Sequence, residues 1–125
     1  DILVGFPGEG ENDFDRTLAV MKEAGLGRVH VFPYSERPGT LAEKMSDKVP
    51  REKKNLRTSL AISLGRELYD RYAKKFINRK VEILLENNDR GYTRNYIEAF
   101  CKGARGKNRI VKTEALRYAG GKLEC

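Results

Sequence analysis

Few residues of this 125-residue sequence belong to types that commonly perform catalysis. The one histidine, His30, lies in an apolar run that reads as a strand, with no base or nucleophile beside it. The two cysteines, Cys101 and Cys125, are far apart and have no Cys or His neighbour at metal-ligand spacing. We therefore assign no catalytic residue and no metal ligand, and interpret the cysteines as reduced thiols of a cytoplasmic protein.

A glycine-rich loop, GFPGE, follows the first apolar run and is the first candidate ligand site. Gly5 and Gly8 let the backbone approach a ligand closely, and Pro7 fixes the turn. A tight strand-to-helix turn without a ligand explains the pattern equally well, with Glu9 as an N-terminal helix carboxylate.

A second candidate loop, YSERPGT, follows the second apolar run and contains Tyr34, Ser35 and Arg37. The residues between the loops predict a strand, helix, strand unit, with strands over 2–6 and 28–32, the second broken at Pro33. The helix is expected to be capped by Asn12 or Asp13, and its apolar residues Phe14, Leu18 and Met21 recur at spacings of four and three. Parallel strands joined in this way carry ligands on the loops at their carboxyl ends, although an ordinary polar turn remains the alternative for YSERPGT.

A long helix is predicted after Pro50, because leucines recur every fourth residue. Its apolar stripe consists of Leu56, Leu60, Leu64 and Leu68, flanked by Ala61, Ala73 and Phe76. Basic residues at its beginning oppose the helix dipole, so helix stability does not explain them and a solvated face is expected. These residues are Arg51, Lys53, Lys54 and Arg57.

Beyond Asn78 the apolar period changes to two, since Val81, Ile83 and Leu85 alternate with Glu82 and Glu86. The turn signal NNDRG follows, and then the short strands GYTRNYIEAFCKG, RIVKTEALRY and KLEC. This pattern predicts an α/β segment followed by all-β structure, with a small antiparallel barrel in residues 79–125. The expected domains are 1–78 and 79–125.

The charge distribution marks the β segment as the place for a polyanion. Residues 1–78 hold 14 basic and 12 acidic side chains, whereas residues 79–125 hold 11 and 6. Aromatic rings alternate there with donors able to stack bases and bind phosphate, and a run of cations follows. The candidates are Tyr92, Arg94, Asn95, Tyr96, Lys102, Arg105, Lys107 and Arg109. A solvated basic loop with tyrosines in the barrel core is the alternative.

The segments DILVGFPGE, HVFPYSERPGT and GYTRNYIE, taken in order, resemble the methylthiotransferase family of radical S-adenosylmethionine enzymes. The resemblance implies the last strands and helices of a partial radical-SAM β/α barrel, followed by a TRAM domain, a small OB-like barrel that binds RNA. It also implies S-adenosylmethionine and two 4Fe-4S clusters, whose cysteine ligands lie outside this chain, so this part alone would be inactive. HVFPYS is similar to the branch that methylthiolates C2 of N6-threonylcarbamoyladenosine beside the tRNA anticodon.

Carried over by position, the resemblance implies two sets of contacts. The cofactor-binding set is Gly5, Pro7, Gly8, Glu9, Phe32 and Tyr34, and Arg37 joins the RNA-binding candidates above. The implied partners are tRNA and a missing N-terminal part of the same polypeptide. The sequence offers no candidate membrane span, and the oligomeric state stays open.

The sequence departs from the family pattern at Gly10, where a threonine is usual, and with KLEC as its last strand the TRAM barrel is expected to be incomplete at that edge. Three alternatives remain open: a non-catalytic RNA-binding module, a purely structural β/α domain with a basic surface, and the isopentenyl-adenosine or ribosomal-protein branch of the same family.

Overall fold

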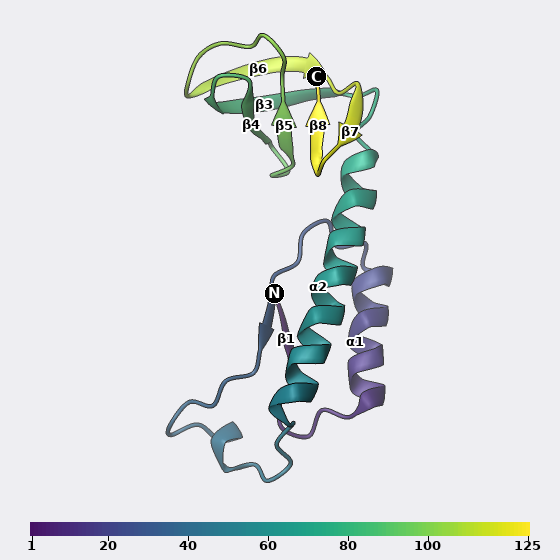
Figure 1. Ribbon diagram of the computed structural model, residues 1–125, viewed down its shortest axis with the longest axis vertical. Helices are drawn as coiled ribbons and strands as arrows, with labels where there is room; N and C mark the ends of the chain where they lie inside the picture. The colour runs from purple at the N-terminus through teal and green to yellow at the C-terminus, as the bar shows by residue number, and fades with distance from the viewer. The chain divides into compact units, whose positions relative to one another are not determined.

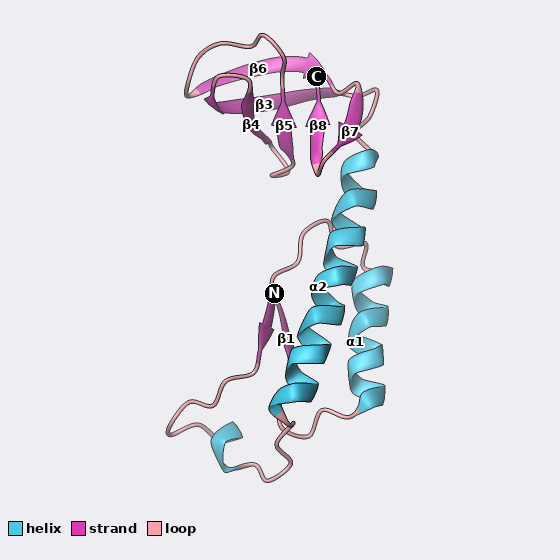
Figure 2. Ribbon diagram, in the orientation of Figure 1, coloured by secondary structure: helices cyan, strands magenta, loops and turns pink.

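The structure, a computed structural model, describes residues 1–125 and divides into two compact units, 1–69 and 70–125. The first unit contains β1 (Ile2–Val4), α1 (Glu11–Glu23), β2 (Val31–Pro33), the 3-10 turn η1 (Ala42–Lys44) and most of α2 (Arg51–Lys74) (Figure 1). The second contains β3 (Lys80–Asn87), β4 (Arg90–Thr93), β5 (Glu98–Phe100), β6 (Arg109–Glu114), β7 (Arg117–Ala119) and β8 (Lys122–Glu124) (Figure 2). The predicted order, α/β and then β, is confirmed. Neither long helix combines the length and apolar character of a membrane span.

The strand, helix, strand unit forms with parallel strands, as predicted, but its second strand lies further along the chain. β1 pairs with β2 in the register Leu3 to Phe32 and Val4 to Pro33, so the expectation that Pro33 breaks the strand is wrong. The amide of Ile2 donates to the His30 carbonyl, and Tyr34 donates to Val4. The residues of this segment that bond to β1 are therefore even-numbered, His30 and Tyr34. An N–H at position 33 would point away from β1, so Pro33 costs this pairing no hydrogen bond.

Helix α1 begins earlier than its capping residues predicted. Its N-cap is Gly10, and Asp13 lies inside the first turn, where its carboxylate accepts the Gly10 amide at 3.0 Å. Asp13 therefore satisfies a backbone donor from within the helix, in place of a hydroxyl at the cap. Phe14 and Met21 are buried, as their spacing predicted, and pack with Val4 in the first core.

Helix α2 buries the predicted stripe in its second half but not in its first. Leu64 and Leu68 are buried, but Leu56 and Leu60 are 60% and 47% exposed. A four-residue step advances about 40° beyond a full turn, so a leucine at every fourth position drifts off one face. The face that meets the core continues instead through Ala61 to Arg57, whose side chain is buried.

In the second unit, strand β3 alternates as predicted, with Val81, Ile83 and Leu85 buried. Its hairpin partner β4 follows the turn at Asp89, which has a φ of 64°. Gly91 is required beside this turn, because a Cβ there would collide with the backbone of Leu84.

The segment GYTRNYIEAFCKG forms two strands, β4 and β5, where one was expected. Thr93 and Tyr96 reverse the chain between them: the amide of Thr93 donates to the Ile97 carbonyl, and that of Tyr96 to Thr93. The turn needs a residue in the left-handed region, and Tyr96 adopts it with a φ of 58°.

The sheet of the second unit is mixed, so the expectation of a purely antiparallel arrangement is wrong. Its strand order is β6-β3-β4-β5-β8-β7, and β5 pairs with β8 in parallel. This pair is possible because residues 101–121 travel through β6 and β7 before returning to β5. Strand β8 is consequently bonded on both sides, to β5 and to β7.

The two cysteines meet at the end of the parallel pair. Phe100 lies opposite Glu124, so Cys101 and Cys125 are the next residues along, and the Cys125 amide donates to the Phe100 carbonyl. Both thiols are free. Burial raises the pKa of Cys101, and burial together with the neighbouring Cys101 thiol raises the pKa of Cys125 to about 12.

The shift of the apolar stripe on α2 predicts opposite outcomes for two leucines. Leu68→Ala should lower the free energy of unfolding by about 2–5 kcal/mol, because it opens a cavity in the first core. Leu60→Ala, the matched control, should change it by less than about 0.5 kcal/mol. Urea denaturation followed by circular dichroism measures both. Equal losses for the two variants would contradict the observed face of α2.

The raised thiol pKa values predict a stability that falls at high pH. Because the fold favours the neutral thiols, their contribution is complete below the ordinary cysteine pKa of 9.0 and is lost as pH rises toward about 12. The melting temperature should therefore decline above pH 9, and less steeply in Cys125→Ala.

Native protein at pH 8 should react with a disulfide reagent much more slowly than protein in urea. Equal reaction rates would show that the thiols are not protected.

Candidate cofactor loop and nucleic-acid surface

The loop after β1 is held in one conformation by its own backbone and by a distant segment. Gly5 and Gly8 have φ values of 74° and 87°, which a residue with a Cβ rarely adopts. The amide of Gly8 donates to the Asp47 carbonyl at 2.7 Å, and that of Glu9 donates to Phe6 at 2.9 Å. At Gly5 a Cβ would also collide with the side chain of Lys54.

Glu9 links the two ends of this loop to helix α2. One carboxylate oxygen accepts the Gly5 amide at 2.8 Å, and the other accepts Arg57 Nη1 at 2.7 Å. The same Arg57 nitrogen donates to the Glu9 carbonyl at 2.9 Å. The side chains of Arg57 and Glu9 are 2% and 11% exposed, so this ion pair is shielded from solvent.

The basic residues at the beginning of α2 are thereby explained, and the expected solvated face is wrong for two of them. Arg57 is buried, and the half-buried Lys54 donates to the Tyr34 carbonyl at 3.3 Å, whereas the exposed Lys53 pairs with Glu11 at 2.9 Å. The hydrogen bond from Lys53, with help from Arg57, lowers the pKa of Glu11. These cations join α2 to the loops after β1 and β2, which compensates for their unfavourable place at a helix N-terminus.

Tyr34 is the residue of the second loop that meets the first. Its ring packs edge-on against Phe6 with centroids 5.2 Å apart, and Lys54 Nζ lies 5.8 Å from the ring centroid. The Tyr34 hydroxyl is buried without a hydrogen-bond partner. Phe32 is 51% exposed and lies opposite Leu3, while Arg37 is exposed in the following turn.

A small cavity of about 270 Å³ opens beside the glycine-rich loop. Its lining comes from the loop after β1 and the approach to α2, namely Gly8, Glu9, Gly10, Asp47, Lys48, Val49, Pro50 and Lys53. The candidates Gly8 and Glu9 therefore border a cavity, whereas Phe32 does not line it. None of the side-chain groups in the chain combines three acidic, histidine or cysteine residues in a metal-holding arrangement.

The entire net charge of the protein belongs to the second unit. Residues 1–69 contain 11 Lys or Arg and 11 Asp or Glu, whereas residues 70–125 contain 14 and 7, a net of +7. Attraction of a polyanion is therefore a property of the β unit.

The predicted aromatic residues of this unit lie at its surface, so the alternative that they fill the core is wrong. Tyr92 is 37% exposed and Tyr96 67% exposed. The hydrogen bond from Lys112 at 3.1 Å, together with the charge of Arg94 at 2.9 Å, lowers the pKa of Glu82. The Asn95 amide donates to the Tyr72 hydroxyl at 2.8 Å, so Asn95 is already engaged within the unit.

The predicted cations of the loop between β5 and β6 are exposed and form no ion pair. They are Lys102, Arg105, Lys107 and Arg109. The amide of Gly106 donates to the Asn88 side chain and that of Asp89 donates to Ala104, so this loop is fastened to the turn between β3 and β4. The turn that joins β4 to β5 holds Arg94 and Tyr96 and lies at the opposite end of these strands from the cation-rich loop. The structure therefore separates the candidates into two groups, one at each end of the strands.

Sequence reasoning missed the outward face between these two groups. Leu84 lies between Tyr92 on β4 and Ile110 on β6, and Leu84 and Ile110 are 47% and 63% exposed. Arg90 lies opposite Phe100 beside this row and forms no ion pair. Leu84 itself could have indicated this face in the sequence. It is apolar and alternates with Ile83 and Leu85, which were already expected to point into the core, so it had to point outward.

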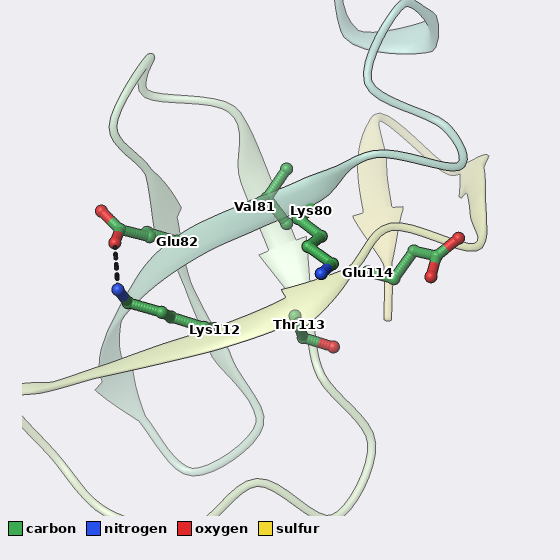
Figure 3. A pocket seen from close by; sticks show the side chains of 6 residues that line it. All are labelled: Lys80, Val81, Glu82, Lys112, Thr113 and Glu114. Carbon is green, nitrogen blue, oxygen red and sulfur yellow. Dashed lines mark ion pairs between the residues drawn. The ribbon is translucent and has the colours of Figure 1, made fainter.

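A wider cleft of about 650 Å³ runs along the β3 and β6 pair (Figure 3). Its lining includes two lysines and two glutamates, Lys80, Lys112, Glu82 and Glu114, with Val81 and Thr113. Figure 3 shows the Lys112 and Glu82 side chains directed at each other. Because the charges balance, this cleft has no preference for an anion, and we do not count it in the nucleic-acid surface.

Comparison with known proteins gives relatives along the whole chain, although no family model matches it. The chain is 39% identical to the threonylcarbamoyladenosine tRNA methylthiotransferase MtaB of Bacillus subtilis over 94% of its length. It is 35% identical over its full length to the protein of that name from Rickettsia prowazekii. It is 43% identical over 72% of its length to tRNA-2-methylthio-N(6)-dimethylallyladenosine synthase of Nitratidesulfovibrio vulgaris.

The matched regions are a small part of those proteins, because the chain spans 28%, 30% and 20% of their respective lengths. Within the chain, however, the matches to both MtaB proteins extend over the glycine-rich unit and the basic β unit. At 35–43% identity, the chain belongs to the methylthiotransferase family of radical S-adenosylmethionine enzymes.

Proposed function

We propose that this chain is the C-terminal portion of a tRNA methylthiotransferase that adds a methylthio group to C2 of N6-threonylcarbamoyladenosine beside the anticodon. In this proposal residues 1–78 close a partial radical-SAM β/α barrel, and residues 79–125 are a TRAM domain that binds tRNA. The observation that carries the proposal is the division of the chain into a neutral unit with a preformed glycine-rich loop and a β unit with a net charge of +7.

The strand connections of the second unit support an OB-like barrel. The end strands of the sheet order, β6 and β7, are separated only by Ala115 and Leu116. Ala115 exchanges backbone bonds with the Asn78–Arg79 segment, while the amide of Leu116 already donates to Glu124 on β8. The segment 109–119 thus acts as one bent strand that joins both ends of the order, an arrangement suited to a closed barrel.

The exposed apolar face of the first unit supports its place in a larger sheet. β1 and β2 pair only with each other, so each has an unpaired edge. Leu3 and Phe32 lie opposite each other and are both 51% exposed, while Val4 is buried toward the helices. Further parallel strands from the complete polypeptide would pair with these edges and cover this face.

The residues around the glycine-rich loop fit S-adenosylmethionine. Gly5 and Gly8 shape the tight turn and Gly8 borders the cavity, the Phe6 and Tyr34 rings offer an apolar surface, and the Tyr34 hydroxyl is a buried polar group without a partner. When bound, this cofactor supplies the methyl group and the radical chemistry of the reaction. The chain's own residues would bind and orient it, with Glu9 fixing the loop and Phe32 facing the adenine side. We propose that the ligands of both 4Fe-4S clusters belong to the missing N-terminal part.

We propose that tRNA meets the outward side of the β unit. The unpaired cations Lys102, Arg105, Lys107 and Arg109 would contact phosphates, while the exposed rings of Tyr92 and Tyr96 would stack on bases. Arg94 shares the Glu82 carboxylate with Lys112, so it would contribute less than an unpaired cation. Arg37 would add a phosphate contact from the first unit. The complete enzyme is expected to work in the cytoplasm.

A second candidate substrate is isopentenyl-type adenosine. The relative named as a dimethylallyladenosine synthase has the higher identity, 43%, but over 72% of the chain. Coverage alone does not separate the candidates, because a synthase of the same name from Acetivibrio thermocellus matches 98% of the chain at 36% identity. Over comparable coverage the Bacillus subtilis protein named for threonylcarbamoyladenosine has the higher identity, 39%, which favours the first candidate.

Neutralising the loop cations should weaken tRNA binding and flatten its salt dependence. In the double variant Lys102→Gln with Lys107→Gln, the slope of log K against log salt should decrease by about 1 to 2. The matched control, Lys22→Gln with Lys44→Gln, removes two exposed lysines from the first unit and should leave the slope unchanged. Filter binding of anticodon stem-loop RNA at several salt concentrations measures both. An unchanged slope in the loop variant would remove the assigned RNA surface.

The reaction itself is tested with the complete polypeptide. The coding sequence upstream of Asp1 should contain, in frame, a CxxxCxxC motif and further cysteines. Expressed in a bacterium without its own methylthiotransferases, the complete protein should produce 2-methylthio-N6-threonylcarbamoyladenosine, detected by mass spectrometry of tRNA nucleosides. The isopentenyl product in its place would transfer the chain to the second candidate. A start codon directly before Asp1 would leave a non-catalytic RNA-binding module.

A further inference from the structure

We propose that Arg57 is a positioning residue that fixes the glycine-rich loop Gly5–Glu9 from helix α2. The inference rests on the proposed role of this loop in cofactor binding, but the mechanical claim stands on the contacts of Arg57 alone. Arg57 belongs to none of the predicted sites, and it is the largest fully buried side chain in the protein.

The first step is the geometry of the contact. Arg57 Nη1 reaches two acceptors of one residue, the Glu9 carboxylate at 2.7 Å and the Glu9 carbonyl at 2.9 Å. Arg57 Nη2 lies 3.3 Å from Glu11, and the guanidinium carbon lies 5.5 Å from the centroid of the Phe14 ring. Acceptors in the loop and in the first turn of α1 therefore share one rigid guanidinium. A lysine ammonium at this position could not contact all of these acceptors with the same geometry.

The second step carries this constraint into the loop. Because the other Glu9 oxygen accepts the Gly5 amide at 2.8 Å, the carboxylate closes a ring over residues 5–9. The Arg57 side chain fixes the rotamer of Glu9, and Glu9 fixes the position of the Gly5 amide. Lys54, one turn earlier on α2, contacts the Tyr34 carbonyl, so the same helix holds both candidate loops.

The third step is the cost of losing the contact. Glu9 is almost as buried as Arg57, so either partner left alone would be a buried charge without compensation. Arg57 Nε is buried without a partner, so the guanidinium keeps this position although one of its donors makes no hydrogen bond. A residue that only covered the core would not need this charge, since Ala61 and Leu64 continue the same face with apolar side chains.

Hydrogen exchange measures the positioning without any cofactor. In Arg57→Lys, exchange of the Gly5 and Glu9 amides in this chain should become about tenfold faster or more, because a charge-assisted bond holds the loop. Amides of the buried face of α1 serve as an internal check that the unit remains folded. The matched control is Arg66→Lys, an exposed arginine of the same helix without an ion pair, which should change nothing. Unchanged loop exchange in a folded Arg57→Lys variant overturns the proposal.

A double-mutant cycle separates positioning from general destabilisation. Glu9→Gln should also speed loop exchange, and adding Arg57→Lys to it should have little further effect, because both act through one contact. Full additivity of the two effects would instead show that Arg57 acts elsewhere. This cycle keeps the proposal testable if either single variant loses some stability.

Cofactor affinity distinguishes this proposal from the proposed function. In the reconstituted complete enzyme, Arg57→Lys should weaken S-adenosylmethionine binding, measured by calorimetry, about tenfold relative to Arg66→Lys. If loop exchange accelerates but affinity is unchanged, Arg57 positions the loop and the loop's cofactor role is wrong. If affinity falls while loop exchange is unchanged, the positioning role is overturned and the cofactor site stands.

Discussion

The first unit depends on one buried ion pair, between Arg57 of α2 and Glu9 of the loop after β1. A buried pair is a weak source of net stability, because desolvation of both charges offsets much of their attraction. Its value is specificity: the pair admits one register of helix against loop, and the Gly5 amide is bonded to the same carboxylate. The apolar contacts of Phe14, Met21 and Leu68 supply the burial, and the ion pair selects the arrangement.

The second unit is organised by a different constraint, the parallel pairing of β5 with β8. Parallel neighbours require a long return path, and residues 101–121 provide it by adding β6 to the far side of β3 and β7 to the far side of β8. The cation-rich loop after β5 is a part of that path. Its position at one end of the strands, away from the Tyr96 turn, therefore follows from the topology and gives the β unit two separate groups of possible RNA contacts.

Local sequence patterns predicted most helices and strands and many of their buried residues. The features that they missed depend on contacts between residues far apart in the sequence. Alternation gave the buried residues of β3, and spacing gave Phe14 and Met21 of α1. The same reasoning chose Leu56 and Leu60 for the core because leucines recur every fourth residue, and it passed over Arg57 because it expected the basic residues to be solvated. The acid that makes Arg57 burial possible is 48 residues earlier in the chain, and no local window contains both. Among the nucleic-acid candidates, likewise, composition could not distinguish Arg94, which shares Glu82, from the unpaired Lys107.

The basic residues at the beginning of α2 are not expected to compete with the β unit for a polyanion, because the two units differ in how their cations are paired. In the first unit lysines and arginines face an equal number of acids, and Lys48, Lys53 and Arg57 are each paired with a glutamate. In the second unit cations outnumber acids two to one, so pairing of Lys112, Arg117 and Lys122 still leaves an excess. Because exposed charges are screened within about 8–10 Å at physiological salt, a polyanion responds to this local excess. The division of charge thus lets internal ion pairs hold the glycine-rich loop of one unit, while the excess cations of the other unit stay available for the proposed contact with tRNA.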